Sequence, residues 1–199
     1  MIKHKSQRVG VFIDVQNMYY SAKNLFGTKV DFGHILETAV AGRQLIRAIA
    51  YVVKATGEET AFFDALYHRG IETREREMQI FPDGARKADW DVGLAIDAVR
   101  ISEILDVVIL VTGDGDFYEL AEYLKHRGRQ VEVVAWQPTA SAKLIAAADD
   151  FVDLAAESGR YLIAGSTTAS RRTPSSRGSR TAAAADSILT PASDLDLGL

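Results

Sequence analysis

The chain has 199 residues, of which 47% are hydrophobic and 25% charged, as expected of one ordinary globular domain with a sizeable core. Its formal net charge of -4 excludes a global basic field that would attract nucleic acid or an anionic membrane, so any polyanion must meet a local basic patch. The absence of cysteine excludes disulfides, thiolate zinc sites, iron-sulfur clusters and a cysteine nucleophile.

The N-terminal segment, residues 1–7, is basic and is expected to be flexible. The apolar run VGVFI that follows is too short for a signal-peptide core and is interrupted by Asp14. No stretch approaches the roughly 18 to 20 apolar residues that a membrane span needs. With no cysteine, the chain suits a reducing compartment, so we expect a cytoplasmic protein without a membrane partner.

From residue 8 onwards, β-branched runs alternate with helix-length segments. Strands are predicted over 8–14, 44–53, 71–80, 106–114, 129–136 and 151–154, and helices over about 33–41, 58–69, 91–104, 116–127 and 140–147. This alternation predicts a three-layer, Rossmann-like α/β fold, with a mostly parallel sheet and helices on both faces. The run VVILV suits a central strand buried on both faces. The charged run IETREREMQI suits an exposed edge strand.

The composition changes near residue 160, where the chain becomes rich in Ser, Thr, Ala, Arg and Pro. We therefore predict a folded domain over 8–158 and a disordered tail over 159–199. Four tail arginines could touch a phosphate backbone, although a solvated linker is favoured: Arg171, Arg172, Arg177 and Arg180. The tail could also serve a homodimer or a protein partner.

Acidic residues follow two of the apolar strands and begin one predicted helix. Asp14 ends the first strand, Asp114 and Asp116 follow the strand that ends near Thr112, and Asp91 begins the helix at 91. In an open parallel sheet, ligands bind beyond the carboxyl ends of the strands. Carboxylates gathered there would repel one another unless a cation neutralised them. An all-oxygen site suits Mg²⁺ or Mn²⁺, which can activate water for phosphodiester cleavage.

Each carboxylate also has a structural interpretation. Asp116 is favoured as the N-cap of the following helix, and for Asp91 a cap and a ligand are equally favoured. Asp14 ends a strand where no helix cap is evident, so a functional role is favoured. Asp97 lies about 240° around the helix from Asp91 and is a secondary candidate. Asp89 could be a solvated loop residue and is also held as secondary.

Three segments, FIDVQN, KADWDVGLAIDAV and VTGDGDF, resemble in order and spacing the motifs of the NYN domain, a PIN-like nuclease family that includes the LabA-like bacterial proteins. The resemblance covers about residues 8 to 155. It implies a PIN-like fold with Mg²⁺ or Mn²⁺ and ribonuclease activity, and we expect the RNA partner to be single-stranded. Carried over by position, it assigns metal and catalytic roles to Asp14, Asp91, Asp114 and Asp116, supported by Asn17, with Lys87 on the substrate phosphate and Thr112 as a secondary hydroxyl. Family members often have a shorter spacing after the lysine, so Asp89 is an alternative to Asp91 at the metal; Asp91 is favoured because Val92 follows it as in the motif.

Other functional classes lack their motifs. No Gly-x-Gly-x-x-Gly follows the first strand, no P-loop is present, and the four histidines show no zinc-ligand spacing. Gln16 occupies the position where a haloacid-dehalogenase-like phosphatase needs its second aspartate. The leading hypothesis is therefore a metal-dependent ribonuclease, most simply an RNA endonuclease. The alternative is a non-catalytic RNA-binding or regulatory module of the LabA-like type.

Overall fold

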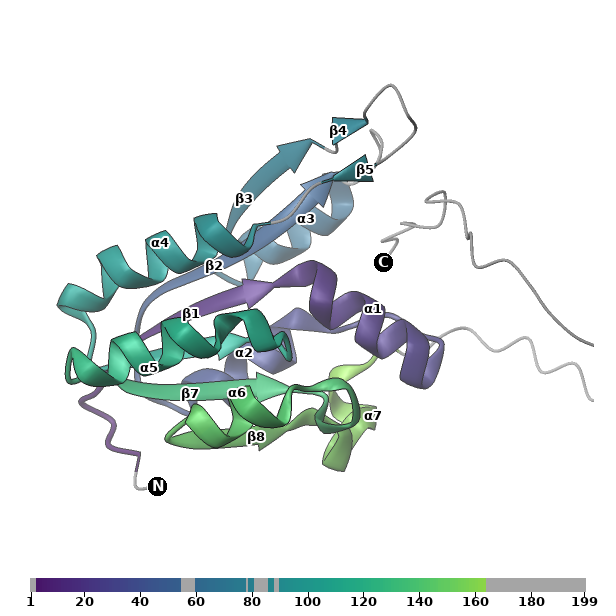
Figure 1. Cartoon of the computed structure of the whole chain (residues 1–199). Coiled ribbons are helices and arrows are strands. Elements are labelled where there is room, and N and C mark those ends of the chain that lie inside the picture. The colour runs from purple at the N-terminus through teal and green to yellow at the C-terminus, as the bar shows by residue number, and fades with distance from the viewer. Residues whose placement is uncertain (1–2, 55–59, 78, 81–85, 88–89, 164–199) are drawn as a thin grey trace, which may run out of the picture.

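The computed structural model describes residues 3–54, 60–77, 79–80, 86–87 and 90–163. Six parallel strands form the main sheet in the order β3-β2-β1-β6-β7-β8 (Figure 1). Their bounds are β1 (Arg8–Asp14), β2 (Gln44–Lys54), β3 (Glu72–Glu77), β6 (Val107–Val111), β7 (Gln130–Ala135) and β8 (Asp150–Asp153). Two short strands, β4 (Gln79–Ile80) and β5 (Arg86–Lys87), pair antiparallel beside them.

Helices cover both faces of the sheet, which confirms the predicted three-layer α/β fold (Figure 1). One face packs against α1 (Val15–Phe26), α2 (Phe32–Val40), α3 (Thr60–His68) and α7 (Ser158–Tyr161). The other packs against α4 (Asp91–Ile101), α5 (Tyr118–His126) and α6 (Ala142–Ala147). Short 3-10 turns complete the chain: η1 (Ser102–Ile104), η2 (Gly115–Phe117), η3 (Gln137–Thr139) and η4 (Leu154–Glu157).

The burial of the strands follows their sequences. All five residues of β6 are buried, as the continuous run VVILV predicts for a strand between two helical layers. At the edge, β3 leaves five of its six residues exposed, and its alternating Glu and Arg residues discourage pairing with another sheet. The predicted central and edge positions are both confirmed.

The strand order reverses between β1 and β6. From β1 the chain winds outward through β2 to β3, and from β6 it winds the other way through β7 to β8. At such a switch point the connections leave the two neighbouring strands in opposite directions, which opens a crevice at their carboxyl ends. Asp14 ends β1 and Thr112 directly follows β6, so the crevice lies between two of the motifs found in the sequence.

The prediction omitted helix α1. Its buried residues are Val15, Met18, Tyr19 and Ala22, which have the i, i+3, i+4, i+7 spacing of an amphipathic helix, so the signal was in the sequence. The helix ends at Gly27, whose φ of 67° is the left-handed conformation that glycine adopts without steric cost.

The folded part extends past the predicted boundary at 158. Tyr161 is buried, Leu162 forms a β-bridge with Val30, and the Ile163 amide donates to the Lys29 carbonyl at 2.9 Å. The start of the predicted tail therefore belongs to the domain, and the rest of it, 164–199, lies outside the described residues. No helix in the described ranges has the length and apolar character to cross a bilayer.

Candidate metal centre

Asp14 sits at the joint between β1 and α1 and is the N-cap of that helix. Its Oδ1 accepts from the Asn17 backbone amide at 3.1 Å, and its Oδ2 accepts from the Thr112 hydroxyl at 3.3 Å. The expectation that Asp14 serves no helix was wrong, because α1 begins directly after it. These two hydrogen bonds occupy one lone pair on each oxygen, and a carboxylate has further lone pairs for a ligand.

The turn after β6 is tied to the β1-α1 joint by a short hydrogen-bond chain. The buried Thr112 hydroxyl accepts from the Asp114 amide at 3.1 Å while it donates to Asp14. The Asn17 side-chain oxygen accepts from the Gly113 amide at 2.9 Å. Thr112 and Asn17 therefore fix the position of Asp114 relative to Asp14. Residues that hydrogen-bond to metal ligands orient those ligands in the same way.

Gly113 is needed for a close approach of two loops. A Cβ there would lie 3.0 Å from the Ala140 Cα, and the Gly113 carbonyl accepts from the Ser141 amide at 2.8 Å. A side chain at residue 113 would therefore push the turn that carries Asp114 away from the loop before α6.

We expect Gly113→Ala to lower the free energy of unfolding by about 1 to 3 kcal/mol, because the added methyl group overpacks this contact. Thermal unfolding and a Mn²⁺ titration would measure the loss of stability and of metal affinity together. Gly159→Ala is the matched control, since a Cβ at Gly159 meets no atom within 4 Å. Equal melting temperatures for the two variants would contradict the role given to Gly113.

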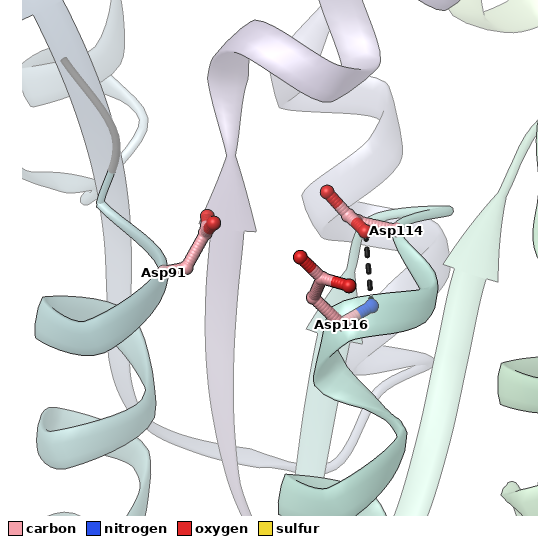
Figure 2. A group of neighbouring side chains, drawn as sticks. All are labelled: Asp91, Asp114 and Asp116. Atoms are coloured by element: carbon pink, nitrogen blue, oxygen red, sulfur yellow. Dashed lines mark hydrogen bonds between the residues drawn. The ribbon is translucent and has the colours of Figure 1, made fainter. Parts of the chain in front are cut away.

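Asp91 is the first residue of α4, and its carboxylate meets those of Asp114 and Asp116. One oxygen from each of the three lies within 4.8 Å of the others. Figure 2 shows Asp91 on one side of the β1 end and the Asp114–Asp116 pair on the other, with the side chains turned toward the space between them. Asp91 and Asp114 are half-buried, and Asp116 is exposed.

The helix caps differ from those predicted. Asp114, not Asp116, caps the turn η2, because its Oδ1 accepts from the Asp116 amide at 3.0 Å (Figure 2). Trp90, not Asp91, is the N-cap residue of α4, and no side-chain cap bond forms there. Neither Asp91 nor Asp116 is therefore a capping residue, while Asp14 and Asp114 both cap and face the cluster.

Burial and like charge raise the pKa of Asp14 to about 6. The largest cause is desolvation, and the charges of Asp91 and Asp114 add to it, while the hydrogen bonds from Asn17 and Thr112 oppose it. A raised pKa means that ionising Asp14 costs more free energy in the folded protein than in the unfolded chain. A bound cation would relieve this cost.

Asp97 lies outside the cluster, as its helical position predicts. It accepts from the Tyr51 hydroxyl at 3.0 Å and lies 3.7 Å from Arg74 Nε. Lys87 is in β5, but its side chain and the whole of Asp89 lie outside the described residues. Their predicted roles at the substrate phosphate and the metal stay predictions.

A cleft of about 440 Å³ lies between three of the acidic residues and one side of α1, while Asp116 lines a neighbouring hollow together with Asp91. Asp14, Asp91 and Asp114 line the cleft together with Asn17 and Trp90. Sequence reasoning missed the rest of the lining: Gln16, Tyr20, Ser21, Asn24 and Thr139. Recognition of α1 would have placed the first four of these on one polar face.

The two tryptophans are both used in packing. Trp136 is buried, and its Nε1 donates to the Met18 carbonyl at 3.3 Å. Trp90 is half-buried, donates to the Val52 carbonyl at 2.9 Å and carries the Arg76 guanidinium 4.4 Å from its ring centroid. A Cβ at Gly93 would lie 2.6 Å from the Trp90 ring, so this glycine makes room for it.

The sequence of this chain matches the model of a known protein family, and the match includes the acidic residues at the switch point of the sheet. The model of the NYN domain matches residues 8–155. The chain belongs to the NYN domain family. The match covers the main sheet and the acidic cleft, which lie within these residues.

Two individual proteins are also similar to this chain. The low amplitude and bright protein LabA of Synechococcus elongatus is 29% identical over 160 residues, which cover 75% of this chain and 85% of LabA. The crystal structure of VPA0982, a protein of unknown function from Vibrio parahaemolyticus, has a TM-score of 0.73 and 30% identity, and the match covers 82% of this chain and 100% of that one. The predicted fold and family are both confirmed.

Proposed function

We propose that this NYN domain is a metal-dependent ribonuclease that cuts RNA phosphodiesters with a carboxylate-bound Mg²⁺ or Mn²⁺. The observation that carries the proposal is the cluster of Asp91, Asp114 and Asp116 beside Asp14, at the topological switch point of a PIN-like sheet. Asp14, Asp91, Asp114 and Asp116 are the proposed ligands, and Asn17 and Thr112 hold two of them in place.

The cluster fits a small hard cation. Two oxygens bound to the same octahedral Mg²⁺ lie about 3.0 Å apart when cis and about 4.2 Å apart when trans, since each Mg–O bond is about 2.1 Å. One oxygen from each of the three aspartates lies within 4.8 Å of the others, so movement of the side chains toward one another would allow them to share one ion. Among the described residues neither Asp114 nor Asp116 forms an ion pair, which leaves their charges available for a cation.

The donor set also argues for Mg²⁺ or Mn²⁺ over zinc. All candidate ligands are carboxylate oxygens, and no cysteine exists in the chain. When bound, such a cation supplies an acidified water and neutralises the negative charge that develops on a phosphoryl group.

The protein's own groups would position the reactants. Thr112 donates to the Asp14 carboxylate and accepts from the Asp114 backbone amide, and Asn17 accepts from the Gly113 amide, so the two residues hold Asp14 and the turn that carries Asp114 in place. The exposed Asp116, close to Asp91 and Asp114, is proposed to accept a proton from a water or to bind the cation through one. Lys87 is proposed to contact the substrate phosphate, and RNA is the proposed partner.

The direct test is an incubation of the purified protein with single-stranded RNA and DNA oligonucleotides across a titration of Mg²⁺ and Mn²⁺. We expect RNA cleavage that depends on the metal and stops on chelation. A circular RNA tests the proposed endonuclease mode, because an exonuclease cannot attack a substrate without ends. No cleavage of any substrate with either metal would contradict the proposal.

The second candidate is a non-catalytic RNA-binding or regulatory module. Similarity to LabA favours it, since that protein's name refers to low amplitude and brightness rather than to RNA cleavage. Under this alternative, Mn²⁺ would raise the melting temperature and RNA would bind without being cut. The same titration, followed by thermal unfolding, separates the two candidates.

A further inference from the structure

The side of α1 that faces the cleft is a polar stripe with one exposed aromatic ring. Gln16, Asn17, Tyr20, Ser21 and Asn24 all line the cleft and span about 140° of the helix at 100° per residue. The buried residues of α1, among them Met18 and Ala22, lie on the opposite side. The stripe is therefore a polar face of α1 turned away from the core, and its Asn17 also bonds to the Gly113 amide.

Tyr20 is the aromatic centre of this stripe. Its side chain is exposed, with 43% of its surface accessible, and its ring packs edge to face on Tyr19 with centroids 5.4 Å apart. The contact with the buried Tyr19 orients the Tyr20 ring, and the exposed part of its side chain is left open to a ligand. An exposed, oriented ring in a cleft is a stacking surface for a planar ligand.

Amide side chains lie on either side of this ring along the helix. Gln16 precedes Tyr20 by four residues and Asn24 follows it by four, so the three stand in one row. Among the described residues, neither amide has a hydrogen-bond partner. Each offers both a donor and an acceptor, which is the pairing that the edge of a nucleobase requires.

The charges of the cleft decide which part of a nucleotide faces α1. The acidic residues lie at the strand ends and at the start of α4, whereas all five lining residues of α1 are neutral. A phosphate would lie near the carboxylates only with a cation between them, while the uncharged base is free to turn toward the neutral wall.

We propose that this face of α1 binds an unpaired nucleobase, stacked on Tyr20 with its edge hydrogen-bonded by Gln16 and Asn24. The proposal rests on the proposed function, because it places the base of the nucleotide whose phosphate meets the metal site. It makes the cleft selective for single-stranded nucleic acid, since a base paired within a duplex exposes neither face for stacking.

The test compares binding of a fluorescent single-stranded RNA with that of a matched strand whose central residues are abasic. Both strands carry the same phosphates, so only the base contacts differ. Binding is measured by anisotropy with Ca²⁺ in place of Mn²⁺, and gels verify that the strands stay intact. We expect the wild type to prefer the base-bearing strand, and Tyr20→Ala to weaken that binding by about 5- to 100-fold while barely changing the abasic strand.

Matched variants separate stacking from general effects. Tyr20→Phe keeps the ring and should bind as the wild type does. Tyr67→Ala removes an even more exposed tyrosine, 77% accessible, from outside the cleft lining, and should have no effect. The double variant Gln16→Ala and Asn24→Ala should discriminate less between single-stranded homopolymers of different bases. Its RNA binding should still depend on Tyr20.

The outcomes distinguish this inference from the proposed function. Equal binding of the base-bearing strand by wild type and Tyr20→Ala, or no preference over the abasic strand, overturns the nucleobase site even if Mn²⁺-dependent cleavage occurs. A preference that depends on Tyr20, without cleavage under any metal, supports the nucleobase site and overturns the nuclease proposal.

Discussion

Replacement of Asp114 by Asn is expected to reduce Mn²⁺-dependent cleavage of single-stranded RNA at least about a hundredfold. Mutation of a residue that hydrogen-bonds to a metal ligand typically lowers metal affinity or activity by roughly 10- to 100-fold. Loss of a direct ligand should cost at least as much. The variant should fold normally, because an Asn side-chain oxygen can still accept from the Asp116 amide as Asp114 does. Initial cleavage rates at saturating RNA would measure the effect.

Asp97→Asn is the matched control for this loss. It removes one carboxylate from α4, the same helix that carries Asp91, but Asp97 bonds to Tyr51 and Arg74 outside the cluster. The Asp97 variant should keep the wild-type rate, apart from any loss of stability. Wild-type cleavage by Asp114→Asn would exclude this carboxylate as a metal ligand.

Asp14→Asn is expected to stabilise the metal-free protein at neutral and higher pH. The pKa of Asp14 is about 6 in the folded protein against 3.8 for an ordinary Asp, so the folded state binds its proton more tightly than the unfolded state does. The contribution of Asp14 to the free energy of unfolding therefore falls as the pH rises from about 4 to 6, and it stays low above this range. At pH 8 the neutral variant should be more stable by about 1 to 3 kcal/mol.

Urea unfolding with a chelator at pH 4 and pH 8 would measure this difference. The advantage of Asp14→Asn should disappear at pH 4, where the wild-type carboxyl is also protonated. Asn remains a good N-cap for α1, so capping should not obscure the comparison. Mn²⁺ should restore the stability of the wild type at pH 8 but not add to that of the variant. A less stable variant at pH 8 would contradict the proposed cost of ionising Asp14.

Much of the site could be predicted because its residues are adjacent to strong local patterns. Apolar runs fix where β1 and β6 end, and parallel strands bring their carboxyl ends to the same edge of a sheet. The sequence alone thus sufficed to place Asp14 and Asp114 near one another. The position of Asp97 away from the cluster followed equally directly from helix geometry.

The helix caps could not be assigned correctly because several acids near a helix start compete for the same bond. Asp114 and Asp116 are two residues apart, and either can cap a turn that begins nearby. Which one does so depends on the 3-10 turn η2, whose start is set by the contact of Gly113 and Gly115 with the loop before α6. That contact joins segments about 27 residues apart and leaves no local signal.

The sequence by itself determined the α/β class, the central and edge strands, and the set of acidic motifs, because these depend on periodicity and on short segments. Only the tertiary structure decided that Asp91 meets Asp114 and Asp116, that Thr112 links Asp14 to Asp114, and that α1 forms a neutral wall of the cleft. These relations arise where elements distant in the chain pack together. Their geometry is set by the order of the strands and the burial of the helices, which no local pattern specifies.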